Sequence, residues 1–508
     1  MKHILFTVIA VLIALVGESF VMGAAPVVPA NQSMRATIDG RRWFIAQFRA
    51  TVLKPDSAAA MQPMLARIGA LPFAREHAVI DPMVEVLTLA KANNYQDIAD
   101  QDWAPVDRLF DQALAAGLPR IMVTLVFKLD PTNPVLAQYC ALQEHAEPNG
   151  SIVSRAIANG SCLPQYANPD YQAMVVRLTA IAVRHFERRF GGAVIGYEPA
   201  GGVAGEIDWK GTDARGNPVF GDVSPSMLVR YREKLQGAVG STPLALAMLS
   251  KRRGARFNSW SDVRPLARGN LHGPEGGGTF AGILGTTFAQ ARYDVMRDFY
   301  ARLHQTVSSN APTKLFSLRM GAILDPTAVL RGTIYVQQFA NDIRPDLMAS
   351  DASTFNHLYE GPVIAPTIYH EGAYGTGVKW PNAAMWMTFA DRFATYDAKR
   401  IDYKRKITQQ IRDSFDRNGF RAMGFYMNPV EIVQHPEYVQ FLASLAPFFN
   451  RTPVDIMPRR FVDVPLRQFI DQPNGQSSYV AMLRAIKGAT GNFQDPVAVR
   501  FTTDPTER

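Results

Sequence analysis

The sequence predicts an α/β protein, a (β/α)8 TIM barrel with long insertions in its βα loops and a short C-terminal extension. Apolar runs of strand length alternate along the chain with segments in which apolar residues recur at helical spacing. This alternation is typical of a parallel sheet that helices cover on both faces. About eight strand candidates occur between residues 40 and 450, and eight is the number of strands that closes a barrel.

Four strands are expected in the first half of the barrel: Arg42–Val52, Met83–Ala90, Arg120–Phe127 and Ala193–Tyr197. Each is dominated by apolar and β-branched residues, as buried strands are. The third and fourth strands are each preceded by a helix that ends at glycine, predicted at Trp103–Gly117 and Tyr171–Phe190. These helix–strand pairs are the repeating unit of the predicted barrel.

The second half repeats the pattern, with strands expected at Lys314–Met320, Asp346–Ser350, Pro362–Tyr369 and Ala422–Met427. Helices are predicted at Phe288–Ser308, Thr333–Ile343 and Asp397–Asn418. The insertions Asp130–Pro169 and Leu249–Gly282 follow strands or βα units, so they are placed to roof the face where the strands end. The catalytic barrel is thus expected over residues 40–450, and residues 451–508 are expected to form an extension packed on it.

Residues 1–24 have the pattern of a signal peptide. Lys2 and His3 precede the apolar run Ile4–Val16, and small residues follow at Gly23-Ala24-Ala25. We expect cleavage after Gly23 or Ala24, a secreted or periplasmic protein, and no stable membrane insertion once the signal is removed. An uncleaved anchor is the alternative, although the run is short for a membrane span. In an oxidising compartment, Cys140 and Cys162 are close enough in sequence to form a disulfide. The sequence does not decide whether they do.

The formal net charge of +8 favours an acidic partner, and an acidic polysaccharide is one candidate. The basic residues are scattered, without the basic stripe interleaved with aromatics that nucleic-acid-binding proteins show, so no nucleic acid is expected. The sequence contains no HExxH or CxxC motif, and two cysteines alone are too few ligands for a metal site. No metal and no cofactor are therefore expected.

Acidic residues cluster where predicted strands end, which is where barrel enzymes place their active sites. Glu198 and Glu206 lie in the glycine-rich turn after the fourth strand, and Glu371 comes shortly after the predicted seventh strand. Hydrolysis of a glycosidic bond needs one carboxyl to protonate the leaving oxygen and a second to attack or to activate water. We therefore select Glu206 and Glu371 as the catalytic pair, on opposite walls of the mouth.

Residues near the same strand ends are candidates for binding a sugar. Aromatic rings stack on the apolar faces of sugars, and polar side chains bind hydroxyl groups. The predicted substrate contacts are Tyr197, Trp209, Arg319, Asp351, Tyr369, His370, Tyr374, Trp380 and Asn428. Arg319 has two open interpretations, a group that keeps a catalytic carboxylate ionised or a structural ion pair.

Three segments resemble the family 42 β-galactosidases and their clan A relatives. Ile364–Trp380 is similar to the nucleophile segment of that family, Asn418–Tyr426 to its entry into the eighth strand, and Val194–Trp209 to the acid/base segment of the fourth strand. The resemblance implies a retaining glycoside hydrolase in which Glu371 is the nucleophile and Glu206 the acid/base. Gly205 and Tyr197 stand where clan A enzymes usually have Asn before the acid, so Glu198 stays open as the alternative acid.

Two further functions stay open beside an exported hydrolase of poly- or oligosaccharides. One is a catalytically inactive barrel that binds a polysaccharide and assists its export. The other is a polysaccharide lyase, in which a Tyr or His removes a proton next to a uronate carboxylate.

Overall fold

The structure of the protein is a computed structural model. The structure describes residues 40–200, 210–265, 282–320, 342–350, 381–385, 421–453, 460–465 and 497–502, with short gaps in the first two ranges, and a few isolated residues between 339 and 416. Within these residues no helix combines the length and apolar character that a membrane span needs.

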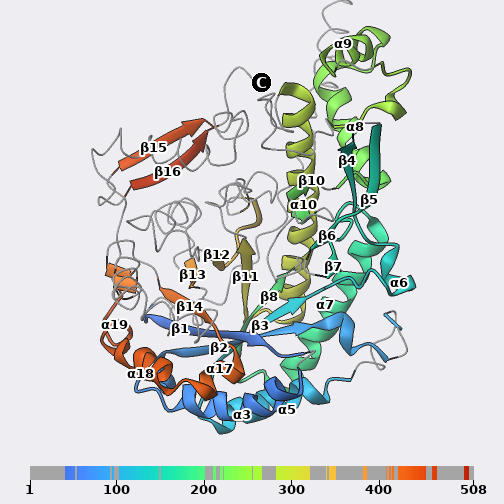
Figure 1. Ribbon diagram of the computed structural model, residues 1–508. Helices are drawn as coiled ribbons and strands as arrows, with labels where there is room; N and C mark the ends of the chain where they lie inside the picture. Colours follow the sequence, from blue (N-terminus) through green and yellow to red (C-terminus); the bar gives the residue numbers. More distant parts are fainter. Residues whose placement is uncertain are drawn as a thin grey trace, which may run out of the picture.

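Eight parallel strands form a closed barrel in the order β1-β14-β13-β12-β11-β8-β3-β2 (Figure 1). In chain order the strands are β1 (Trp43–Arg49), β2 (Ala78–Glu85), β3 (Ile121–Val126), β8 (Val194–Ala200), β11 (Leu315–Met320), β12 (Leu347–Ser350), β13 (Pro381–Met385) and β14 (Ala422–Tyr426). Neighbours in the barrel are neighbours in this sequence of strands, and β14 closes on β1 through the pair Trp43↔Ala422. The predicted (β/α)8 barrel is confirmed.

Helices on the outside of the barrel cover the apolar outer faces of the strands. They are α3 (Pro55–Gly69), α4 (Ala74–His77), α5 (Ala104–Ala115), α7 (Pro169–Phe190), α8 (Pro225–Val239), α10 (Gly282–Asn310), α17 (Pro429–Gln434), α18 (Pro436–Ser444) and α19 (Ala446–Phe449). α3 packs between α17 and α5, and α10 between α7 and α8. These contacts join the described outer helices into two groups.

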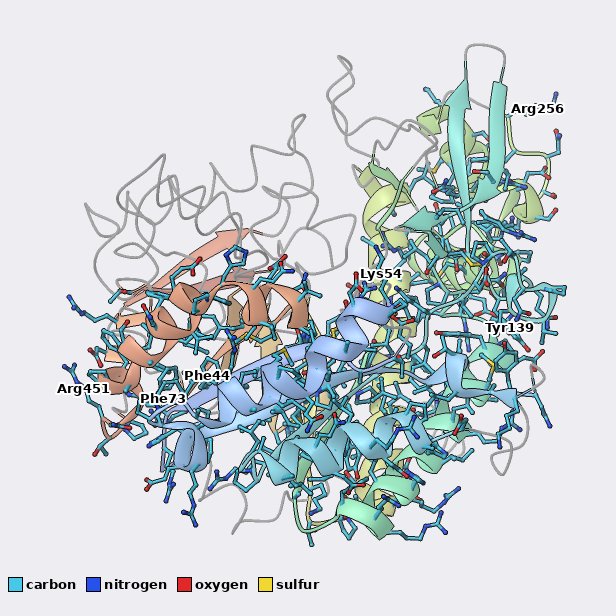
Figure 2. All side chains as sticks on the ribbon, turned by 60° about the horizontal axis from the view of Figure 1, so that its bottom comes forward. Phe44, Lys54, Phe73, Tyr139, Arg256 and Arg451 are labelled. Carbon is cyan, nitrogen blue, oxygen red and sulfur yellow. A yellow bond between two sulfur atoms is a disulfide. The ribbon has the colours of Figure 1, made fainter. Side chains whose placement is uncertain are left out.

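Aromatic packing joins the first and last parts of the barrel. The Phe44 ring of β1 lies 5.3 Å from Phe73, 5.2 Å from Phe425 of β14 and 5.7 Å from Phe449 of α19, measured between ring centroids. Figure 2 shows Phe44 and Phe73 together at this side of the barrel. Because such pairs stabilise beyond the area they bury, this cluster fixes the C-terminal helices against the first strand.

α7 begins and ends where local chemistry requires it. The Asn168 side chain accepts hydrogen bonds from the backbone N–H groups of Asp170 (2.9 Å) and Tyr171 (3.2 Å), and Pro169 occupies the first turn. Asn at the N-cap followed by Pro is a favoured helix start. The helix therefore begins two residues before the predicted Tyr171 and ends at the predicted Phe190.

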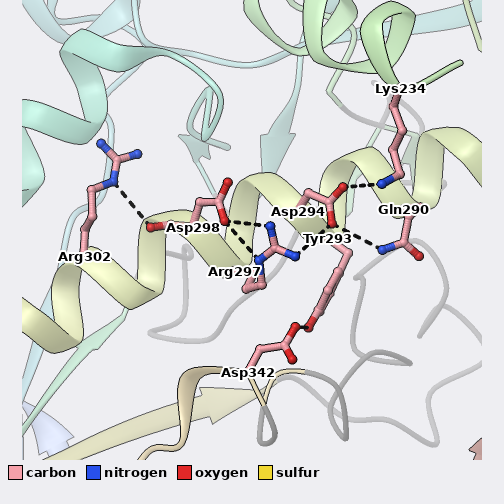
Figure 3. Close-up of polar contacts among 8 residues, drawn as sticks. All are labelled: Lys234, Gln290, Tyr293, Asp294, Arg297, Asp298, Arg302 and Asp342. Carbon is pink, nitrogen blue, oxygen red and sulfur yellow. Dashed lines mark hydrogen bonds and ion pairs between the residues drawn. The ribbon is translucent and has the colours of Figure 1, made fainter. Parts of the chain in front are cut away.

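α10 is connected to its neighbours by polar contacts on two sides (Figure 3). Asp294 accepts a hydrogen bond from Lys234 of α8 at 2.5 Å, and Gln290 and Arg297 of α10 also donate to it. The Tyr293 hydroxyl donates to Asp342 at 2.5 Å, which connects α10 to the segment that precedes β12. The helix before the fifth strand is thus held on both flanks.

The insertions after β3 and β8 build one lobe beside the barrel. It contains α6 (Pro134–Ala137), the hairpin β4 (Leu142–Glu147) and β5 (Gly150–Arg155), a four-stranded sheet of β6 (Ile157–Ala158), β7 (Ser161–Cys162), β9 (Lys210–Thr212) and β10 (Pro218–Phe220), then α9 (Pro243–Arg253) and a 3-10 turn η3 (Trp260–Asp262). Cys140 and Cys162 form a disulfide in it. The pair Ile157↔Thr212 joins strands of the two insertions, so both segments share one sheet.

Two strand predictions differ from the structure. The second strand is β2, Ala78–Glu85, and the expected Val86–Leu89 is instead a 3-10 turn, η1. The position expected for Pro362–Tyr369 in the barrel is occupied by β13, Pro381–Met385. Pro362–Tyr369 lies outside the described residues, as do most of Thr333–Ile343 and Asp397–Asn418.

The C-terminal part contains two strands that the sequence does not predict. β15 (Arg460–Pro465) and β16 (Val497–Thr502) pair in parallel, with Val462↔Val499 at the centre. The packing of residues 451–508 on the barrel stays a prediction.

Candidate functional site

The interior of the barrel changes from apolar to polar toward the carboxyl ends of the strands. An apolar layer fills the amino-terminal half: Trp43, Ile45, Val79, Met122, Ile195, Leu315, Leu347 and Ala422. Successive inward positions on a strand are two residues apart. The next inward residues are therefore Gln47, Asp81, Thr124 and Ser317, and all four are buried. Polar side chains thus converge below the end of the barrel where barrel enzymes work.

Arg319 of β11 is the centre of this polar layer. Its Nε donates to Oε1 of Glu198 on β8 at 2.6 Å, and its Nη2 donates to Oδ2 of Asp81 on β2 at 2.7 Å. The exposed fractions of Arg319, Glu198 and Asp81 are 2%, 1% and 1%. Burial opposes the charged guanidinium, but the two carboxylates outweigh it and raise the pKa of Arg319. One guanidinium therefore bridges two carboxyl groups across the barrel.

Further donors complete the shell of Asp81. Its Oδ2 also accepts from Gln47 Nε2 at 2.7 Å, and its Oδ1 accepts from the Thr124 hydroxyl at 2.6 Å. Gln47 and Asp81 are direct register partners on β1 and β2. The Asp81 carboxylate therefore has three hydrogen-bond donors from three strands.

Glu198 is held by Arg319 and two hydroxyl groups. Its Oε2 accepts from Ser317 Oγ at 2.6 Å, and the Thr124 hydroxyl lies 3.3 Å from its Oε1. Burial raises the pKa of Glu198, the Arg319 charge lowers it, and the Asp81 charge raises it again, with a net upward shift. In the conformation described, the Glu198 carboxyl is therefore held by its contacts with Arg319, Ser317 and Thr124.

The interpretation of Arg319 as an ion-pair residue agrees with the structure, whereas Tyr197, a predicted substrate contact, lies elsewhere. Tyr197 is fully buried and points outward, where its hydroxyl donates to Oε1 of Glu187 on α7 at 2.7 Å. It does not line the barrel interior, because a register irregularity between β3 and β8 breaks the alternation at Ile195, and Tyr197 lies on the face opposite Glu198. Asn428 is the N-cap of α17, and its Oδ1 accepts from the Val430 N–H at 3.1 Å.

The remaining predicted site residues lie outside the described residues: Glu206, Trp209, Asp351, Tyr369, His370, Glu371, Tyr374 and Trp380. Glu206 belongs to the segment between Ala200, the last residue of β8, and Lys210, the first of β9. Asp351 follows the last residue of β12. Glu371 precedes β13 in the chain, so its predicted place just after the seventh strand is wrong, while its catalytic role stays a prediction.

Four residues of the buried layer were missed from the sequence: Gln47, Asp81, Thr124 and Ser317. Asp81 had a detectable signal, since a charged residue inside an apolar run of strand length is unusual. Gln47, Thr124 and Ser317 are uncharged and occur commonly in strands, so only the barrel shows that they converge. Within the described part of the chain, no group of three or more His, Cys, Asp or Glu side chains is placed to hold a metal ion.

Several solved structures that are similar to this chain are β-galactosidases. A β-galactosidase from the haloarchaeon Halorubrum lacusprofundi has a TM-score of 0.57 at 10% identity, covering 90% of this chain and 66% of that one. The enzyme from Rahnella sp. R3 has a TM-score of 0.56 at 12% identity, covering 91% and 65%. A family 42 β-galactosidase from G. stearothermophilus has a TM-score of 0.54 at 10% identity, covering 90% and 65%.

This chain thus spans about two thirds of the length of these enzymes. No protein-family model matches it, and no curated protein is significantly similar in sequence. The likeness at this identity concerns the fold. The chain has a (β/α)8-barrel fold, and its fold is similar to that of the family 42 β-galactosidases.

Proposed function

We propose that the protein is an exported glycoside hydrolase that cleaves a poly- or oligosaccharide with retention of configuration. The observation that carries the proposal is the closed barrel whose interior turns polar below the carboxyl ends of its strands, in a fold similar to that of β-galactosidases. An apolar floor below a polar layer suits a barrel whose mouth binds a hydroxyl-rich ligand.

Glu206 is the proposed acid/base. The segment that contains it starts at the mouth end of the fourth strand and is fixed at its other end in the lobe sheet, through β9. Glu198, the alternative acid, is occupied by Arg319, Ser317 and Thr124 inside the barrel. These contacts favour Glu206 over Glu198 for proton transfer to a leaving group.

Glu371 is the proposed nucleophile. It belongs to the connection that leaves the mouth after β12, where Asp351 also lies in sequence. In a retaining enzyme the two carboxyl groups stand about 5–5.5 Å apart. An acidic polysaccharide is the proposed substrate class for a chain with a formal net charge of +8.

Digestion of a glycan panel, followed by mass analysis of the products, tests the proposed activity directly. We expect release of new reducing ends with the anomeric configuration retained. Affinity without any cleavage would instead favour the binding barrel, and an unsaturated product absorbing ultraviolet light would indicate the lyase.

Replacing Glu371 with Ala should lower kcat at least about 1000-fold, because the covalent step loses its nucleophile. Azide should partly restore turnover and yield a glycosyl azide. A Glu371→Ala enzyme as active as the parent would refute the assignment, and Glu233→Gln, a surface change with the same loss of charge, is the control.

Glu206→Gln should lower kcat most for substrates with poor leaving groups, because such groups need protonation.

A further inference from the structure

Asp81 and Glu198 differ in how many of their hydrogen-bond partners can donate but cannot accept. Amide and guanidinium N–H groups donate but never accept, whereas hydroxyl groups do both. Asp81 Oδ2 receives two such obligatory donors, Gln47 Nε2 and Arg319 Nη2. Glu198 receives one, Arg319 Nε, and among the described residues the partner of its Oε2 is the hydroxyl of Ser317. A proton on Glu198 Oε2 can therefore donate to Ser317, 2.6 Å away.

The charges in the network point the same way. Two carboxyl groups share one guanidinium, and all three side chains are buried. With both carboxyls ionised, the network would carry one uncompensated negative charge inside the barrel, which is costly. One proton makes it neutral, and the donor pattern places that proton on Glu198. The upward shift of the Glu198 pKa agrees with this placement.

The strands around Glu198 each contribute a polar side chain to the network. β3 presents Thr124, β11 presents Ser317 and Arg319, and β2 presents Asp81. Gln47 of β1 reaches the network through Asp81. Among the described residues, Arg319 and Asp81 are the charged groups that act on Glu198. Its protonation is therefore set inside the network.

We propose that Glu198 holds an exchangeable proton beneath the barrel mouth, and that Asp81 and Arg319 are positioning residues that form the fixed ion pair around it. Glu198 lies two residues before Ala200, the end of β8, which is about 7 Å along a strand. Its ionisation at higher pH would place a negative charge just below the mouth. The catalytic consequence rests on the proposed hydrolase function, but the protonation itself does not.

The first test measures stability against pH and needs no substrate. Because folding raises the Glu198 pKa, its contribution to stability is complete below the unfolded-state pKa and is lost as pH rises through the folded-state pKa. The melting temperature of the wild type should therefore fall across this transition. Glu198→Gln, which mimics the protonated form, should lack the transition and be the more stable protein at alkaline pH.

Asp81→Asn should move the same transition to lower pH. The amide keeps its acceptor toward Arg319 and Gln47 but removes the charge that opposes ionisation of Glu198. Glu233→Gln, on the surface, should leave the transition in place. The inference fails if Glu198→Gln retains the transition, or if Asp81→Asn does not move the transition to lower pH.

If Glu198→Gln does not fold, infrared spectroscopy of the wild type and of Asp81→Asn tests the same inference. The wild type near neutral pH should show the carbonyl band of a protonated carboxyl, and Asp81→Asn should lose that band at a lower pH than the wild type. A wild type without any such band would overturn the inference.

The second test is the pH profile of kcat/KM on a cleaved glycan. An ionised Glu198 favours the protonated acid at the mouth, so its charge extends activity to higher pH. In both Asp81→Asn and Glu198→Gln the network stays neutral, and the alkaline limb should move down by roughly 0.5–1 pH unit. A limb that stays in place in both variants overturns the catalytic coupling. A wild type that cleaves no glycan refutes the proposed function, while the stability test still decides the protonation.

Discussion

Tyr197 and Glu198 are adjacent on β8, yet their side chains lie on opposite faces of the sheet. The Tyr197 hydroxyl contacts Glu187 of α7, and the Glu198 carboxyl contacts Arg319 inside the barrel. Burial, followed by the charge of Glu187, raises the pKa of Tyr197, so its hydroxyl stays a donor. The two residues therefore serve the outer helix layer and the interior network respectively.

Replacing Tyr197 with Phe should destabilise the protein by about 1–3 kcal/mol, because a buried hydrogen bond to an acidic group is lost. Since the ring faces α7, kcat/KM should not change. Chemical denaturation and steady-state kinetics measure the two effects. A large rise in KM without loss of stability would return Tyr197 to the substrate site.

Asp81 and Pro82 explain why the second strand was predicted too late. An Asp-Pro pair is typical of turns, and the predicted strand begins after it, at Met83. In the barrel, Asp81 points inward to Arg319, and Pro82 is the register partner of Phe48 on β1. The turn-like residues are thus part of a central strand, and one of them belongs to the candidate site.

At the scale of elements, the disulfide closes a loop within the insertion that follows β3. Cys140 follows α6, Cys162 ends β7, and 22 residues separate them in sequence. The strand β6 inside this loop pairs with β9, which the segment containing Glu206 leads into. The disulfide therefore supports the lobe on which the proposed acid/base segment is fixed.

Replacing both cysteines with Ala should lower the free energy of unfolding by about 3 kcal/mol, because a loop of this length gains entropy in the unfolded chain. Denaturation with and without a reductant gives the comparison. Dithiothreitol should destabilise the parent and leave the double variant unchanged. A parent that is insensitive to reductant, with the thiols shown to be free, would contradict the disulfide.

The conformation of the seventh strand, β13, depends on the strands that pair with it. Pro362–Tyr369 is rich in β-branched and aromatic residues and was predicted, whereas β13 consists of Pro381-Asn382-Ala383-Ala384-Met385, which has little β propensity. β13 pairs with β12 and β14 on its two sides. Pairing on both sides decides its conformation, and sequence periodicity does not report this.

At the scale of the whole molecule, export is the prediction that the described residues do not test. If residues 1–24 are a signal peptide, the protein recovered from a secreting host should begin at Ala24 or Ala25. Mass spectrometry of the intact protein measures the new terminus. A full-length chain that stays with the membrane fraction would favour the uncleaved anchor.

The sequence alone determined the barrel class, most of its strands and the disulfide candidates, because apolar periodicity and helix-ending glycines are local signals. It also marked Glu198 and Arg319 as charged residues near predicted strand ends, although Glu198 lies within β8 and not in a turn after it. Only the tertiary structure decided that these two meet Asp81, Gln47, Thr124 and Ser317. Those contacts join strands far apart in the chain, and barrel closure and register, which depend on all eight strands together, bring them within hydrogen-bonding distance.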